Sequence, residues 1–234
     1  MSSTIAANFT ITPIRVFFDS KKKTEALKVI NRSDSGLSLQ VSLVHWAQDT
    51  EGKDIYTPTT DIVFFPKIIS ILGGEERIIR IGPKVKSGAT EKTYRIFVEE
   101  MKAPQSDEDA GGASVRARVK IGVPIFISPA EALPAIEFLE FSFLSGVFDI
   151  TLKNTGNIQQ WVKKVKVRAL DFKGDEIFTK EVNGTYLLSG ITRIHSLKIP
   201  AEKCSDIMSL DVEVTTDRLT ISERLDVTKD KCSE

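Results

Sequence analysis

The sequence has no net charge, no long apolar run and no visible targeting segment. Its 32 Lys and Arg residues equal its 32 Asp and Glu residues, which argues against nucleic acid or an anionic membrane as the main ligand. The longest apolar runs, such as residues 68–72 with Ser70 inside, are too short to cross a bilayer, so membrane insertion is not expected. Met1 leads directly into a strand-like stretch, without the apolar segment of a secretory signal.

Cysteine and histidine are also scarce. The two cysteines, Cys204 and Cys232, leave open one disulfide, two free thiols or a partial metal site. Neither His45 nor His195 lies near them in sequence, so the ligands are too few for a zinc cluster. No phosphate-binding glycine loop occurs, and no Ser/His/Asp or Cys/His arrangement can be singled out. We therefore expect no catalytic site, no cofactor and no metal.

Alternating apolar and polar residues dominate the pattern, and helical periodicity is scarce. The alternation is clear in residues 37–43, 162–168 and 210–214, and turn clusters such as 31–36 and 154–157 separate such segments. Hydrophobic residues make up 41% of the chain, which is enough to form a core. Many short strands with regular turns predict an all-β sandwich or barrel.

A domain boundary is expected near Pro129. Pro129 and Pro134 bracket a short linker-like stretch, and the strand pattern restarts near Ile136. The boundary divides the chain into residues 1–129 and 130–234, and each part suits a sandwich of about 100 residues.

The segment 115–127 predicts an unusually long strand. Its odd positions are all apolar, whereas its even positions begin with basic residues. Pro124 cannot donate to a ladder, so this part of the strand is expected at a sheet edge or a bulge. The segment is either a long core strand that runs into the linker or a strand that pairs with another chain by β-augmentation. Its apolar residues are Val115, Ala117, Val119, Ile121, Val123, Ile125 and Ile127.

Pro13 interrupts a second strand-like stretch near the N-terminus. The parity of the apolar positions shifts at Pro13, which predicts a bulge or a strand that changes sheets. Arg15 then stands between Ile14 and Val16. It is either a surface arginine whose stem lies on apolar neighbours or a bidentate anchor for a carboxylate.

Taken together, these residues resemble the periplasmic chaperones of the chaperone–usher pilus pathway. The Val-Pro-Ile-Phe sequence at 123–126 is similar to that of the archaic, or alternative, branch. No single motif is specific to this family, but the order of all seven motifs along residues 9–129 is specific to it. The matching motifs are Ile14–Asp19, Val29–Ser33, Trp46–Gln48, Thr59–Pro66, Gly73–Arg80, Glu91–Ile96 and Val123–Phe126.

The resemblance implies two immunoglobulin-like β-sandwich domains in an L or boomerang arrangement. Such chaperones bind pilin subunits that lack a strand, lend them an edge strand, and deliver them to an outer-membrane usher. The location implied is the periplasm, with the signal peptide absent from the sequence given. The edge-strand residues that fill the pilin groove are then Val115, Ala117, Val119, Ile121 and Val123.

The resemblance also implies two basic residues that hold the C-terminal carboxylate of the pilin. Arg15 matches the first. The second, counted five residues back from Pro129, falls on Pro124, so we expect Lys120 instead, with Arg118 as the fallback. Glu91 matches the acidic member of an ion network whose arginine is here Ser128. A Cys204–Cys232 disulfide fits an oxidising periplasm.

Two other interpretations compete with this one. An immunoglobulin-like structural or adhesin subunit of a surface fibre would use 115–127 as an ordinary strand. The basic run 163–168 alternates with valines, which indicates a solvated strand face rather than a nucleic-acid site. The sequence does not say which pilin is the client, or whether the free protein self-associates.

Overall fold

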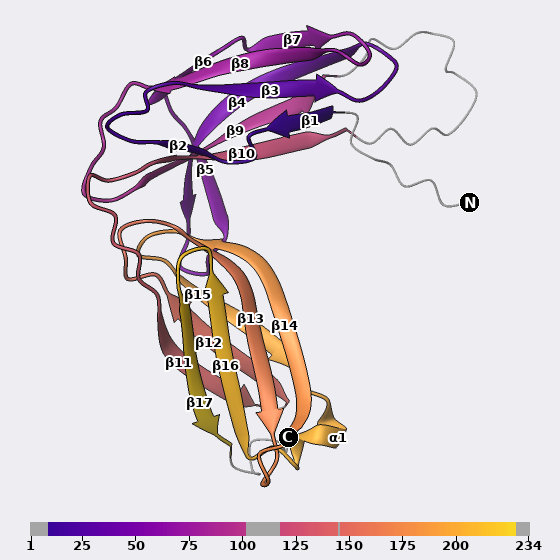
Figure 1. Cartoon of the computed structure of the whole chain (residues 1–234), viewed down its shortest axis with the longest axis vertical. Coiled ribbons are helices and arrows are strands. Elements are labelled where there is room, and N and C mark those ends of the chain that lie inside the picture. The colour runs from indigo at the N-terminus through magenta and orange to yellow at the C-terminus, as the bar shows by residue number, and fades with distance from the viewer. Residues whose placement is uncertain (1–8, 102–117, 145, 228–234) are drawn as a thin grey trace. The chain divides into compact units, whose positions relative to one another are not determined.

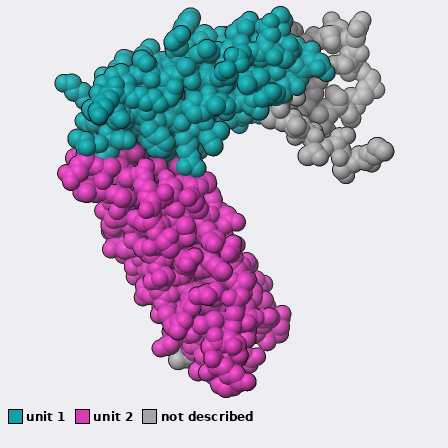
Figure 2. Space-filling model, viewed as in Figure 1, with its two compact units in different colours: residues 1–47, 56–88, 92–130 teal, residues 48–55, 89–91, 131–234 magenta. Residues whose placement is uncertain are grey.

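The computed structural model describes residues 9–101, 118–144 and 146–227. Within these ranges the chain forms 17 strands and one short helix, so the all-β prediction is confirmed. The chain divides into two compact units, which Figure 2 shows in teal and magenta. The first unit comprises residues 1–47, 56–88 and 92–130, and the second comprises 48–55, 89–91 and 131–234.

The first unit contains two sheets, whose strands can be followed in Figure 1. The first sheet has the order β1 (Phe9–Thr12), β3 (Glu25–Asn31), β8 (Glu76–Pro83) and β6 (Ile62–Phe65). The second has the order β2 (Val16–Phe18), β10 (Lys120–Ile127), β9 (Lys92–Glu100), β4 (Leu37–Gln48) and β5 (Asp54–Pro58), with β7 (Ile68–Ile71) also beside β4. The sheets enclose a core because alternate side chains of each strand face inward. Leu27 and Ile79 come from one sheet and Ile96 and Ile125 from the other, and all four are fully buried.

The chain changes sheets at Pro13, as its parity shift predicts. Before it, β1 pairs antiparallel with β3, and Phe9 lies opposite Asn31. After it, β2 pairs parallel with the end of β10, and Val16 lies opposite Ile125. Pro13 suits this corner because it cannot donate a hydrogen bond to either ladder.

The second unit is also a sandwich of two sheets. One has the order β11 (Glu137–Leu144), β12 (Val147–Lys153) and β15 (Thr192–Lys198). The other has the order β14 (Glu176–Leu187), β13 (Gln160–Leu170), β16 (Ser209–Thr216) and β17 (Thr220–Asp226). The helix α1 (Ala201–Cys204), which the sequence did not predict, connects β15 to β16. A register shift between Val162 and Lys164 lets Val162 and Val165 both face the core despite their spacing of three.

The second unit includes two short segments, 48–55 and 89–91, that adjoin strands of the first. The side chain of Gln48 accepts a hydrogen bond from the Leu188 N–H at 3.0 Å and donates one to the Tyr186 carbonyl at 3.1 Å. The side-chain amide of Asn157 donates to the Ala89 carbonyl at 2.9 Å. Polar side chains from β-turns and strand ends thus attach both segments to the second unit.

The cysteine prediction falls partly outside the described residues. Cys204 is buried and is disulfide-bonded. Cys232, its predicted partner, lies beyond residue 227, so the pairing itself stays a prediction. In the described part of the chain, no helix is long and apolar enough to span a bilayer.

Candidate functional site

The long strand expected at 115–127 is present as β10, but β10 begins only at Lys120. Residues 115–117 lie outside the described residues, and Arg118 and Val119 precede the strand. The pairing nevertheless extends to Val119, whose carbonyl accepts a hydrogen bond from the Glu100 N–H at 3.1 Å.

One side of β10 is open along much of its length. β9 pairs with all eight residues of β10, whereas β2 pairs only with residues 125–127. Among the described residues, the stretch 120–124 therefore has a neighbouring strand on one side alone. Pro124 lies at the end of this stretch, just before the pairing with β2 begins, which agrees with the edge alternative of the edge-or-bulge prediction. An open edge offers backbone groups to which another strand can pair.

The apolar residues of this edge differ in how deeply they are buried. Val119 and Ile121 are half-buried at the margin of the core, whereas Val123 is 2% exposed within it. Val115 and Ala117 lie outside the described residues. Val123 is therefore buried in the core of its own unit. Of the three residues that the structure describes here, Val119 and Ile121 keep exposed apolar surface.

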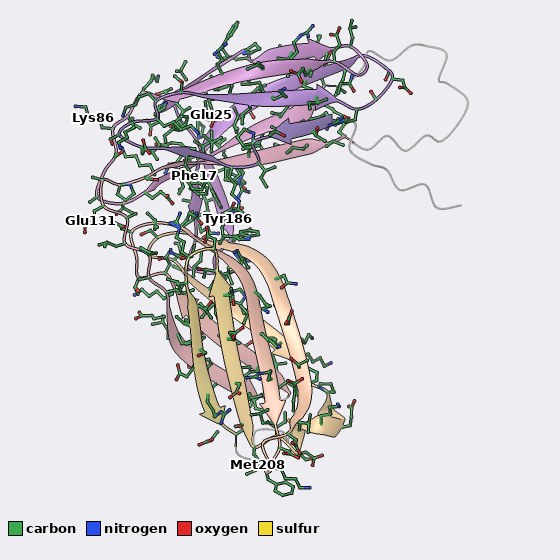
Figure 3. The ribbon with its side chains drawn as sticks, viewed as in Figure 1. Phe17, Glu25, Lys86, Glu131, Tyr186 and Met208 are labelled. Atoms are coloured by element: carbon green, nitrogen blue, oxygen red, sulfur yellow. The ribbon has the colours of Figure 1, made fainter. Side chains whose placement is uncertain are left out.

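The outward face of the second sheet carries a set of aromatic rings, which we call the aromatic face. Phe17, labelled in Figure 3, stacks on Phe126 with ring centroids 5.1 Å apart, and Phe126 lies 6.1 Å from the ring of Trp46. Tyr56 meets Phe97 edge-on at 5.4 Å. Trp46 and Phe126 are buried, yet neither belongs to the core between the sheets.

Two arginines lie in one cross-strand row on this face. Val16 pairs with Ile125 in a parallel ladder. The residues that precede them, Arg15 and Pro124, are therefore neighbours in the same register. On the other side of β10, Pro124 pairs with Arg95 of β9. Neighbouring strands are spaced by about 4.8 Å, so the backbones of Arg15 and Arg95 lie about 10 Å apart. Two guanidinium groups on stems of this length can reach one carboxylate between them.

Lys120 and Arg118 lie farther along β10. Lys120 precedes Pro124 by four residues, which corresponds to about 13 Å of strand. Its ammonium group lies 3.4 Å from a carboxylate oxygen of Glu99 and 4.4 Å from the centroid of the Phe97 ring. Arg118 lies 3.8 Å from the same carboxylate. The structure thus gathers Lys120 and Arg118 around Glu99 and places Arg15 beside Arg95.

Arg95 is a basic residue beside Arg15 that the sequence analysis did not single out. It lies 29 positions before Pro124 in the sequence, and only the β9–β10 register makes them neighbours. The available signal was the matched motif at residues 91–96, which contains Arg95 but does not give its register.

Glu91 occupies a buried polar cluster in the second unit. One carboxylate oxygen accepts a hydrogen bond from the Gln159 N–H at 2.9 Å, whereas the other is buried and has no hydrogen-bond partner among the described residues. Burial raises the pKa of Glu91 to about 7, although the Gln159 hydrogen bond and the charge of Arg218 oppose this rise. The carboxylate of Asp217 adds to it. Glu91 therefore has the environment of a carboxyl group that is protonated below neutral pH.

The described residues contain no group of three or more His, Cys, Asp and Glu side chains that could hold a metal ion. The features that distinguish the site are an open strand edge and a row of two arginines beside aromatic rings. Such a combination suits a peptide chain that pairs in β-conformation and ends in a carboxylate.

Residues 8–133, more than half of the chain, match the family described as pili and flagellar-assembly chaperone, PapD N-terminal domain. The chain belongs to this family. Its members are pilus-assembly chaperones of the chaperone–usher pathway, which confirms the resemblance in the sequence. No curated protein sequence matches the chain.

Solved structures of such chaperones share the fold at low sequence identity. One belongs to the CsuC–CsuE chaperone–tip adhesion subunit pre-assembly complex of archaic Csu pili from Acinetobacter baumannii. It is 18% identical, with a TM-score of 0.59, over 82% of this chain and 91% of that chain. The class 5 fimbriae chaperone CfaA is 14% identical, with a TM-score of 0.59, over 93% of this chain and 98% of that chain. The complex of the Salmonella enterica SafA pilin with the SafB chaperone gives 10% identity and a TM-score of 0.59 over 95% of this chain and 99% of that chain.

Proposed function

We propose that this chaperone binds a pilin subunit by donor-strand complementation through the open edge of β10. The observation that carries the proposal is the stretch 120–124, which has a paired strand on one side alone among the described residues. A partner strand can extend the sheet there with backbone hydrogen bonds. Alternate side chains then enter the groove of the partner.

The groove-filling residues in this proposal are Val115, Ala117, Val119 and Ile121. Val123 is left out because the core of the first unit already encloses it. Burial of an apolar side chain of this size stabilises a complex by about 1.5–3 kcal/mol before association costs. Several such residues in register select one face of the strand, because a one-residue slip would place the basic residues in the groove.

The C-terminal carboxylate of the pilin is held, in this proposal, by Arg15 and Arg95. The alternative pair, Arg15 with Lys120 or Arg118, requires a carboxylate to reach across about 13 Å of strand. The row through Pro124 therefore supports Arg95 as the second anchor, whereas Lys120 and Arg118 lie where the preceding part of the bound strand would pass.

Delivery to an outer-membrane usher and a periplasmic location complete the proposal. Family membership supports both, and the disulfide-bonded Cys204 suits an oxidising compartment. No enzymatic step is needed, because strand exchange can be driven by the burial of apolar groups.

The test is co-expression of the full chain, in a bacterial periplasm, with the pilin subunits encoded beside it. We expect a one-to-one complex with at least one subunit and loss of that complex on Arg15→Ala or Arg95→Ala. Arg77→Ala is the matched control, because Arg77 is an exposed arginine of the same unit that is paired with Glu75. Light scattering of the free chain would show whether it self-associates.

Two results would contradict the proposal. Folded chain that captures none of the subunits would exclude a pilin-binding function. Capture that survives both arginine substitutions would favour the structural-subunit interpretation, in which Arg15 has no binding role.

A further inference from the structure

The Arg95 guanidinium group is fixed before any ligand binds. Its central carbon lies 4.0 Å from the centroid of the Trp46 ring and 5.5 Å from that of Tyr56. One of its terminal nitrogens donates a hydrogen bond to the Tyr56 hydroxyl at 2.6 Å. Trp46 is fully buried, so it provides a rigid surface under the guanidinium plane. Tyr56 therefore fixes the direction in which Arg95 points along that surface.

Tyr56 is itself held in place by Phe97. The two rings meet edge-on, with an interplanar angle of 89° and a centroid distance of 5.4 Å. Tyr56 is 40% exposed, and the Phe97 ring supports it from the side of β9. The Phe97 ring thus contributes to the position of the hydroxyl that Arg95 contacts.

Gly122 leaves the space that both Phe97 and Arg95 occupy. It pairs with Phe97 across the β9–β10 ladder. A Cβ atom at position 122 would lie 2.8 Å from a ring carbon of Phe97 and 3.0 Å from the Arg95 δ-carbon. The first distance is shorter than real Cβ contacts and the second is tighter than most of them, so the Phe97 ring would have to move and the Arg95 side chain would have to adjust. An aromatic ring over a strand glycine is a known way to cover the exposed backbone.

An arginine whose side chain is already held in one conformation binds a carboxylate more tightly than one whose side chain is flexible. An arginine side chain loses much of its rotamer freedom when a ligand orders it, and this loss weakens binding. A guanidinium group that is already oriented avoids most of that cost and presents its two parallel N–H groups in one direction.

We propose that Tyr56 and Gly122 are positioning residues that hold Arg95 in the orientation that receives the partner's terminal carboxylate. The inference rests on the proposed function, because it assigns Arg95 to the carboxylate. Tyr56 acts through its hydroxyl, and Gly122 acts by leaving room for the ring that supports Tyr56.

The test compares two synthetic peptides with the last twelve residues of the captured pilin subunit. One ends in a free carboxylate and the other in an amide, and calorimetry with the full chain gives the ratio of their affinities. We expect Tyr56→Phe and Gly122→Ala each to lower this ratio by about 3- to 10-fold, the effect of one hydrogen bond. The control is Gly36→Ala, where an added Cβ meets no atom within 4 Å. It should leave the ratio unchanged.

A second measurement needs no ligand. Side-chain nitrogen NMR of the free chain should show slow rotation of the Arg95 guanidinium group, and faster rotation in Tyr56→Phe. General destabilisation of the fold would not change the acid-to-amide ratio, so it cannot imitate the expected result.

The outcomes separate the two proposals. If Arg95→Ala lowers the preference for the free acid but Tyr56→Phe and Gly122→Ala do not, the positioning role is wrong and the anchor stands. If Arg95→Ala leaves the preference intact, Arg95 is not an anchor and the inference falls with it.

Discussion

Glu91 makes the stability of the second unit depend on pH in the direction opposite to that of an ordinary carboxylate. The unfolded chain releases this proton near the usual pKa of 4.5, whereas the folded unit keeps it until about pH 7. Between these values the folded state binds more protons than the unfolded state. The free energy of unfolding therefore falls as pH rises through this interval. The difference in pKa corresponds to a loss of about 3 kcal/mol.

Glu91→Gln removes the titrating group and keeps the size of the side chain. We expect the variant to gain stability relative to the parent as pH rises from 4.5 to 7.5, by about 3 kcal/mol. Denaturant unfolding followed by tryptophan fluorescence can report on this unit alone. The chain has two tryptophans, and in a Trp46→Phe background only Trp161 of β13 remains.

The comparison of variant and parent at each pH also removes the effect of His195. This residue is 7% exposed, and burial together with the charge of Arg193 lowers its pKa to about 4. Its contribution to stability has the opposite pH dependence and cancels in the difference if the two sites act independently. A difference between variant and parent that is constant from pH 4.5 to 7.5, or that shrinks as pH rises, would refute the role assigned to Glu91.

Three further predictions follow from buried groups. The free energy of unfolding of the parent should fall by about 3 kcal/mol as pH drops from 6.5 through 4, because the unfolded chain binds a proton at His195 that the folded unit does not. His195→Gln should abolish this fall, measured by unfolding of the second unit. Asn31→Ala should destabilise the first unit by about 2–3 kcal/mol in thermal unfolding. The buried Asn31 amide donates to the carbonyls of Ser35, Ile71 and Leu72, and these three hydrogen bonds would be lost. Val123→Ala should lower the stability of the first unit by about 1–3 kcal/mol. Ile121→Ala should instead weaken pilin capture at nearly unchanged stability, and equal stability losses for the two would contradict the different burial assigned to them.

The fold was predictable from the sequence because its main signal is local. Alternation assigns every second residue of a strand to the core, and this holds wherever the strand lies in the sandwich. The parity shift at Pro13 is local in the same sense. It predicted a bulge or a strand that changes sheets, and β1 and β2 do lie in different sheets. Alternation does not show how far a core extends along a strand. Val119, Ile121 and Val123 look equivalent in sequence, yet only Val123 lies fully inside.

The site was less predictable because its geometry runs across strands. A count back from Pro129 considers residues of one strand only, whereas the proposed anchor Arg95 lies on the neighbouring strand. A side chain on the neighbouring strand and the same face lies only about 5 Å away. Arg95 meets this condition at Pro124, and it does so only through the β9–β10 register.

This geometry predicts that the anchor can be moved from one strand to the other. In the Arg95→Ala background, Pro124→Lys places an ammonium group on β10, in the same cross-strand row and beside Arg15. The added lysine can extend into the space that Arg95 leaves, so we expect it to restore part of the preference for a free-acid peptide over its amide. Lysine presents a single charge rather than two parallel donors, so recovery should be incomplete. If the double variant prefers the free acid no more than Arg95→Ala alone does, the row through Pro124 is not where the carboxylate lies.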